Sequence, residues 1–563
     1  MIRFNELSLI LIKYKTMKKY LTLLLVVILV YACQEKQAPD FFQKYDETQA
    51  LEKQQEHQNP RMKFKLFQSK YLNMNEVFKP FENELENFSE EEYNMLKPLI
   101  IEQNIPSIQK SVRDGQLTYE KLTLFYLYRI RKFESDSTKS LNAIIALNPN
   151  VLNEARQRDQ ERASKRIDQN KVYGMPILLK DNINTAGMPT TAGALALSEN
   201  KNTKDAFIVT RLKEEGALIL GKVNLSEWAY YFCSGCPLGY SAVGGQTLNP
   251  YGRGEFETGG SSAASGAAVA ANYAVAAVGT ETAGSITSPS SQNSLVGLKP
   301  TIGLLSRVGI VPISSTLDTP GPMTKSVMDN WIMINAMYGY DPNDSKSYNY
   351  VDRNYGTFKD NLKGKRFGII KSYLQDSVFN ANVNIIKEAG AEIVEITPPQ
   401  VGLPGFLTLL NIDMKHDLPE YLKNHTDPNV TVRSVKDVVD FNLKDSILRA
   451  PYGQQLFDGI VADTTTVEQL QEIKKTLMKN ARQYFEALDT ENLDAILSIN
   501  NYHSAFSAVA EYPNITVPMG YKKSGEPMNM TFIVKDKEES RLYVLGNAFE
   551  QLTKHRKLPK NYE

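Results

Sequence analysis

Apolar residues recur at the spacing of an amphipathic helix between residues 83 and 162. One side of the predicted helices carries Ile108, Val112, Leu122, Phe125 and Ile130. Apolar residues at steps of three and four are typical of an α-helix that buries one face. A hydroxyl residue, Thr118, stands where a helix N-cap is favoured. The segment 83–165 is therefore predicted to be helical.

Short β-rich runs alternate with helical segments from residue 173 onward. The predicted strands are 174–179, 218–221, 274–278, 366–370, 392–396, 495–498, 514–517 and 529–534. This alternation favours an α/β fold in which a mixed, mostly parallel β-sheet lies between helical layers. A helical segment, 401–479, interrupts the β-rich parts 166–400 and 480–563. We expect this segment to form a wall over a pocket and to set the choice of substrate.

The charge of the chain is balanced, with 64 Lys and Arg against 64 Asp and Glu residues. No run of basic residues stands out, so we expect no nucleic-acid partner. The five histidines lack the spacing of a metal site, and we expect neither a metal nor a cofactor. The sequence leaves the oligomeric state open.

The front of the chain has the pattern of a bacterial secretion signal. Basic residues follow Met17, the apolar run 21–30 comes next, and small Ala32 precedes Cys33. We expect residues 1–33 to form a signal with its true start at Met17. Cys33 would become the lipidated N-terminus of an exported, membrane-anchored protein of the cell envelope. An uncleaved anchor and an ordinary signal peptide remain alternatives, and residues 34–82 are predicted to be a flexible tether.

The stretch from Gly259 to Pro300 is dense in Gly, Ala and Ser and contains no histidine. Small residues let a ligand approach the backbone, and a serine hydroxyl in such a loop can attack a carbonyl carbon. Ser261 and Ser285 are the serines of interest. A serine nucleophile needs a base. With no histidine in this stretch, a lysine is the next candidate, and Lys180 ends an apolar run about eighty residues upstream.

Several ordered motifs in this region resemble those of the amidase signature family. They read Gly259-Gly260-Ser261-Ser262, then Gly279-Thr280-Glu281-Thr282-Ala283-Gly284-Ser285-Ile286, then Val296-Gly297-Leu298-Lys299-Pro300-Thr301. Upstream, a G-x-P-x-x-x-K-D element ends on Lys180-Asp181, and Asp318-Thr319-Pro320-Gly321-Pro322-Met323 follows downstream. The resemblance spans roughly residues 100–552, and it implies one large α/β amidase domain at 83–563.

The resemblance also implies roles for individual residues. Ser285 would be the nucleophile that forms an acyl-enzyme, Ser261 the bridging serine and Lys180 the base. Backbone N–H groups of Thr282, Ala283 and Gly284 would stabilise the oxyanion. The peptide bond between Gly260 and Ser261 would be cis. The chain departs from the common pattern at Ala283, where many members have glycine, and at Thr287, where many have arginine.

Lys180 can act as a base at neutral pH only if it is largely uncharged. Its ordinary pKa is about 10.4, and burial lowers the pKa of a lysine by as much as about 3–5 units. The apolar run 177–179 is suited to place Lys180 in the protein interior, and Asp181 next to it is expected to oppose the shift.

The sequence thus predicts an amide hydrolase that releases ammonia or an amine. The segment 401–479 most resembles the peptide-amidase branch, so the C-terminal amide of a peptide, or a small amide, is the expected substrate. An esterase on the same triad and a catalytically silent binding lipoprotein are the alternatives. The pair Cys233 and Cys236 is read either as a small disulfide or as two free thiols.

Overall fold

The computed structural model describes residues 13–19, 41–162, 171–350 and 361–563. Within these ranges, eleven strands form one sheet in the order β1-β3-β2-β6-β8-β7-β12-β13-β11-β9-β10. The strands are β1 (Ile144–Leu147), β2 (Pro176–Lys180), β3 (Leu218–Val223), β6 (Ala276–Glu281), β7 (Val296–Lys299), β8 (Thr319–Thr324), β9 (Arg366–Ile370), β10 (Glu392–Ile396), β11 (Ala495–Ile499), β12 (Asn514–Tyr521) and β13 (Pro527–Ile533). A separate short pair joins β4 (Tyr240–Ser241) to β5 (Gly245–Gln246).

The sheet is mixed, as the sequence predicted. Strands β3, β2 and β6 run parallel to one another, and so do β11, β9 and β10. The neighbours between these two groups pair in antiparallel fashion. The predicted strands all occur, whereas β1, β7 and β8 of the large sheet and the short pair β4 and β5 were not predicted. Two of these, β7 and β8, carry proline, glycine or lysine and so lack a continuous apolar run.

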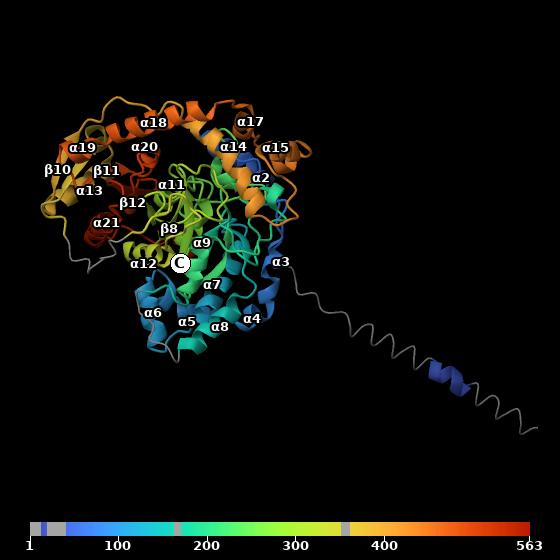
Figure 1. Ribbon diagram of the computed structural model, residues 1–563. Coiled ribbons are helices and arrows are strands. Elements are labelled where there is room, and N and C mark those ends of the chain that lie inside the picture. Colours follow the sequence, from blue (N-terminus) through green and yellow to red (C-terminus); the bar gives the residue numbers. More distant parts are fainter. Residues whose placement is uncertain (1–12, 20–40, 163–170, 351–360) are drawn as a thin grey trace, which may run out of the picture. The chain divides into compact units, whose positions relative to one another are not determined.

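Helices cover the sheet in groups (Figure 1). The helices α10 (Ala263–Ala270) and α11 (Thr287–Gln292) pack on each other and on β6, β7 and β12. The helices α12 (Val327–Met337) and α21 (Glu539–Thr553) also pack together, on β8, β12 and β13, with α9 (Phe207–Glu214) against α12. Helix α13 (Ser377–Glu388) contacts β12 and β10, and the short α19 (Ala487–Thr490) and α20 (Ser504–Val509) flank β11 in the chain.

The first part of the domain is helical as predicted, apart from β1. It contains α4 (Glu82–Asn87), α5 (Glu90–Ile100), α6 (Ile105–Arg113), α7 (Tyr119–Glu134) and α8 (Val151–Arg162). Thr118 caps α7, because its hydroxyl accepts a hydrogen bond of 3.1 Å from the backbone N–H of Lys121. The apolar face read from the sequence is buried, including Leu122, Phe125 and Ile130.

The segment 401–479 forms a group of helices that pack on one another, drawn in orange in Figure 1. They are α14 (Phe406–Asn424), α15 (Val435–Leu443), α16 (Ser446–Arg449), α17 (Gln455–Ala462) and α18 (Val467–Tyr484), which runs beyond the predicted end. Buried apolar side chains hold the group to the rest of the domain. Phe457 of α17 lies with its ring centroid 5.3 Å from that of Trp228 and 5.1 Å from that of Phe232.

The prediction of a flexible tether at 34–82 is wrong for its larger part. Residues from Lys44 onward belong to the compact unit that ends at Glu563. They form α2 (Thr48–Gln55) and α3 (Met74–Phe78), and Phe64, Phe67 and Phe81 are buried. The polar composition of residues 34–60 had suggested a solvent-exposed segment. One of its polar residues, Gln54, is instead buried, and it donates hydrogen bonds to the carbonyls of Met62 and Gly254.

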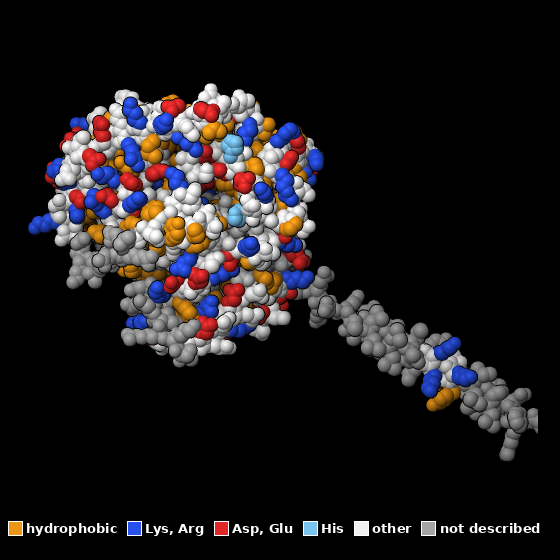
Figure 2. Space-filling model, in the orientation of Figure 1, with side chains coloured by type: hydrophobic (Ala, Val, Ile, Leu, Met, Phe, Trp, Pro, Cys, Tyr) orange, Lys and Arg blue, Asp and Glu red, His pale blue; other side chains and the backbone are white. Residues whose placement is uncertain are grey.

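The predicted lipidation site, Cys33, lies outside the described residues. Among the helices that are described, none is long and apolar enough to span a membrane. Acidic and basic side chains intersperse over the face of the molecule shown in Figure 2.

Candidate active site

Lys180 lies at the end of β2, where the sheet delivers it into the interior. Its side chain is 0% exposed. The amine Nζ lies 2.8 Å from Ser261 Oγ, 2.8 Å from Thr280 Oγ1 and 3.2 Å from the Thr280 carbonyl oxygen. An uncharged amine has two N–H donors and one lone pair. Its two N–H groups can therefore bond to Thr280 while its lone pair faces the hydroxyl of Ser261.

Burial lowers the pKa of Lys180 from 10.5 to about 7, against the opposing charges of Asp318 and Glu281. The expected opposition from Asp181 does not arise. Alternation along the strand turns Asp181 away, and its carboxylate lies 3.2 Å from Lys222 Nζ instead. An amine with a pKa near 7 is about half uncharged at neutral pH and can accept the proton of a neighbouring hydroxyl.

Ser261 has its hydroxyl against the amine of Lys180, and its neighbour Ser262 contacts the turn that carries Ser285. The Gly260–Ser261 peptide bond is cis, as the resemblance implies. The carbonyl of Ser261 accepts a hydrogen bond of 3.0 Å from the backbone N–H of Ser226. Next in the chain, the N–H of Ser262 donates to the Ser285 carbonyl at 3.2 Å, which ties the two serine segments together.

The turn that holds Ser285 joins the end of β6 to the start of α11. Gly284 has a φ of +106°, a conformation that favours glycine, whereas Ala283 is not among the described residues with positive φ. Alanine in place of the commoner glycine therefore causes no backbone strain at position 283. The Ser285 side chain is partly exposed and makes no hydrogen bond to a described residue. Catalytic hydrogen bonds often form only once substrate is bound.

Two buried carboxylates hold this turn in place. Glu281 Oε2 accepts hydrogen bonds of 2.8 Å each from the backbone N–H groups of Ile286 and Thr287. The Thr287 hydroxyl lies 3.0 Å from the same oxygen, so threonine at the usual arginine position contacts the acid of the turn. Asp318 Oδ1 accepts a hydrogen bond from the Thr282 hydroxyl. These contacts fix the backbone on both sides of Ala283 and Gly284.

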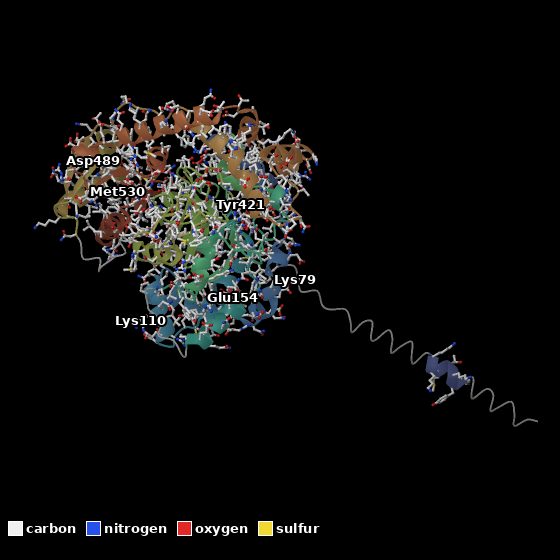
Figure 3. All side chains as sticks on the ribbon, in the orientation of Figure 1. Lys79, Lys110, Glu154, Tyr421, Asp489 and Met530 are labelled. Carbon is white, nitrogen blue, oxygen red and sulfur yellow. A yellow bond between two sulfur atoms is a disulfide. The ribbon has the colours of Figure 1, made fainter. Side chains whose placement is uncertain are left out.

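A cavity of about 240 Å³ opens beside this cluster. Thr280 and Thr282 line it on the side of β6, and the loop 307–320 forms a second side. Helix α14 closes a third side with Asp417, Glu420 and Tyr421, the last of which is labelled in Figure 3. The helical segment 401–479 thus contributes one wall of the cavity.

Sequence reasoning missed Thr280, Glu281 and Asp318 as parts of the site. All three stand inside motifs that the sequence displays, at 279–286 and 318–323. A nucleophile or a base is recognised by its reactive group, whereas a residue that only binds the amine or orients the backbone, as these three do, carries no such signal. Within the described ranges, no group of three His, Cys, Asp or Glu side chains is arranged to hold a metal ion.

Cys233 and Cys236 form a disulfide, with their Cα atoms 5.9 Å apart. The sequence alone was compatible with either a disulfide or two free thiols at these positions. The bridge closes a small loop after Trp228, and both cysteines are buried. The Tyr230 hydroxyl donates a hydrogen bond of 2.9 Å to the Cys236 carbonyl, which attaches this loop to the segment beside the cavity.

Comparison with known proteins agrees with these motifs. A family model described as Amidase matches residues 121–506. The protein named "Probable amidase At4g34880" from Arabidopsis thaliana is 36% identical over an aligned length of 479 residues, and the match covers 82% of this chain and 92% of that protein.

Solved structures are similar over most of the chain. An amidase family protein from Bacillus anthracis has a TM-score of 0.82 and 38% identity, and the match covers 88% of this chain and 100% of that one. The native peptide amidase from Stenotrophomonas maltophilia has a TM-score of 0.76 and 36% identity, over 82% of this chain and 98% of that one.

Proposed function

Because the chain belongs to the amidase family, a family of hydrolases that act on C–N bonds, we propose that it cleaves linear amides through an acyl-enzyme on Ser285. Lys180, Ser261 and Ser285 act as base, proton relay and nucleophile. The observation that carries the proposal is the fully buried amine of Lys180, whose pKa is lowered to about 7 by burial, at 2.8 Å from Ser261 Oγ.

Proton transfer runs along the three side chains. Uncharged Lys180 accepts the proton of Ser261, and Ser261 in turn accepts the proton of Ser285 as the Ser285 oxygen attacks the amide carbon. When the C–N bond breaks, Ser261 donates the proton that it took from Ser285 to the departing nitrogen, and Lys180 returns its own proton to Ser261. Ammonia or an amine leaves, and the acyl group remains as an ester of Ser285. Water then attacks this ester and releases the carboxylic acid.

The negative charge that develops on the carbonyl oxygen needs donors that are already in place. Backbone N–H groups of Thr282, Ala283, Gly284 and Ser285 are the proposed donors. Loss of one such donor typically costs on the order of 100- to 1000-fold in rate. Glu281 and Asp318 support this part of the mechanism because they hold the turn from either side.

Peptide C-terminal amides are the proposed substrate class. The support is the 36% identity and the TM-score of 0.76 to the Stenotrophomonas maltophilia peptide amidase over 82% of the chain. Export to the cell envelope with a lipid on Cys33 is a further part of the proposal. It rests on the pattern of residues 17–33 alone.

Release of ammonia from a panel of peptide amides and simple amides, measured with the purified full chain, tests the proposal. Ser285→Ala and Lys180→Met should each abolish release while the fold is retained by circular dichroism. The wild-type kcat/KM should rise with pH and level off above about pH 7, since the uncharged form of Lys180 is the active one. Turnover of p-nitrophenyl esters without any amide turnover would instead favour an esterase.

A further inference from the structure

The cavity that Thr280 and Thr282 line has an excess of acidic side chains. Asp417 and Glu420 project from α14 to its lining, and Asp318 and Asp344 contribute from the other walls. Asp318 is engaged with Thr282 and with the N–H groups of Ile313 and Ser314. Asp344 is paired with Arg307, so Asp417 and Glu420 of α14 are the acids of this lining that remain available to a ligand.

The basic groups of the same cavity do not balance these acids. Arg307 is held by Asp344, with Nε donating at 2.9 Å to Oδ2, and it also donates to the Ser315 carbonyl. Its charge is thus compensated by a partner of its own. His425 is half-buried, and burial lowers its pKa below 6.5, so its imidazole is mostly uncharged at neutral pH. Among the described residues, no ion pair is formed by Asp417 or Glu420.

Asp417 is well placed to meet a ligand. One of its oxygens, Oδ2, accepts a hydrogen bond of 2.6 Å from the backbone N–H of Ser315, which fixes the carboxylate at the cavity wall. The Ser315 hydroxyl also interacts with this carboxylate, whose remaining acceptor sites are open to a ligand. Glu420 is exposed and accepts a hydrogen bond of 3.2 Å from Asn424, so it lies nearer to solvent.

A second acceptor lies on the catalytic side of the cavity. Asn182 lines the cavity and is 2% exposed. Its Nδ2 donates a hydrogen bond of 3.0 Å to Thr280 Oγ1, which leaves Oδ1 buried without a partner in the described part of the chain. Leaving a buried carbonyl oxygen without a donor is unfavourable, and a ligand N–H group that reaches it would remove that cost.

We propose that this cavity selects amide substrates that carry a cationic group, an ammonium or a guanidinium, which pairs with Asp417 while a substrate N–H donates to Asn182 Oδ1. This inference rests on the proposed function and adds the substrate's charge to it. A cation supplies several N–H donors at once, which suits the two acceptors of this cavity, the Asp417 carboxylate and Asn182 Oδ1. An anionic group at the same place would be repelled by Asp417, because Arg307, the arginine of the lining, is already paired with Asp344.

A charge-matched series of substrates tests the proposal with the full chain. N-acetyl-lysinamide, N-acetyl-norleucinamide and the α-amide of N-acetylglutamate differ mainly in side-chain charge, and free norleucinamide places the charge on the α-amine instead. The wild type should have a kcat/KM about 10- to 100-fold higher for a cationic amide than for the neutral one, mainly through KM. Equal or better turnover of the neutral amide than of both cationic amides would overturn the inference and leave the amidase proposal standing.

Variants separate this effect from a structural role. Asp417→Asn keeps an oxygen that can accept from Ser315, so it should fold, lose about 10-fold or more on the cationic amide and change little on the neutral one. Asp417→Lys should reverse the preference toward the anionic amide. Asp440→Asn, an exposed acid of α15 paired with Lys436, is the matched control and should behave as wild type. Equal losses on all three amides would contradict a charge-selective role.

Binding to the Ser285→Ala protein, measured by calorimetry, keeps the two proposals distinguishable. A Kd at least 10-fold lower for a cationic amide than for acetyl-norleucinamide supports the inference. It does so even if the wild type turns over no amide, because absent turnover would refute the proposed function and not the charge preference. Equal Kd values would overturn the inference whatever the turnover.

Discussion

Replacing Lys180 by methionine should change how the stability of the protein depends on pH. The folded chain holds this amine at 0% exposure, and burial lowers its pKa from 10.5 to about 7. Unfolding returns the amine to water, where its pKa is ordinary. Between these two pKa values the unfolded chain binds more protons, so the stability of the wild type rises with pH in this window. Lys180→Met lacks this contribution.

The magnitude follows from the two pKa values. Each pKa unit corresponds to about 1.36 kcal/mol, and from pH 7 to pH 9 the wild type should gain about 2.3 kcal/mol relative to the variant. The gain in stability is smaller than the energy of two full pKa units, because near pH 7 the amine of the folded protein is still about half protonated. Hydrogen bonds to Thr280 that the variant loses lower its stability equally at each pH, so they cancel from the comparison.

Urea unfolding at pH 7, 8 and 9 measures this difference. Exposed Lys423→Met serves as the control for loss of a lysine and should follow the wild type. A difference in unfolding free energy between wild type and Lys180→Met that stays constant from pH 7 to pH 9 would refute the reasoning. Lys180 would then be charged in the folded protein at neutral pH, and it could not accept the proton of Ser261.

Three other substitutions have defined expectations. Glu281→Ala should lower kcat about 10- to 1000-fold with little change in KM, because two backbone N–H groups at the start of α11 lose their acceptor and the turn becomes less rigid. Steady-state kinetics measure both constants, and a parallel rise in KM would argue against this role. The double change Cys233→Ser with Cys236→Ser should lower stability by about 2 kcal/mol in urea unfolding, the loop-closure entropy of so short a loop; no change would mean that the bridge is absent or strained. Arg556→Met should destabilise the protein by about 1–3 kcal/mol, since it removes the cation that lies 2.8 Å from Glu102, whose side chain is 30% exposed; the double variant with Glu102→Gln should recover part of that loss.

Secondary structure was predictable wherever the pattern was local. The helix start at Thr118, the apolar faces of α6 and α7 and the predicted strands follow from residues close together in the chain. Strand β8, which contains Pro320, Gly321 and Pro322, has no such pattern. It occurs because neighbouring strands β6 and β7 supply the pairing, and that stabilisation is not local.

The docking of residues 44–82 also escaped sequence reasoning. A polar, charged segment ordinarily remains extended in water because it buries too little apolar surface to offset its ordering. Here Phe64 and Phe67 are buried, and Glu47 accepts hydrogen bonds from the backbone N–H groups of Phe67 and Gln68. The surface that receives these residues is built from chain segments far away in sequence.

For the site, the sequence by itself determined which reactive side chains are present and in which motifs, from Lys180 to Ser285. Only the tertiary structure decided their environment. The fold places Asp318 rather than Asp181 within electrostatic range of Lys180, and it places Thr280 in hydrogen-bond contact with the amine. It also brings Asp417 of α14 to the cavity that Thr280 lines. The reason is physical: a motif is set by covalent neighbours, whereas burial, charge and cavity shape depend on side chains that meet only when the chain folds.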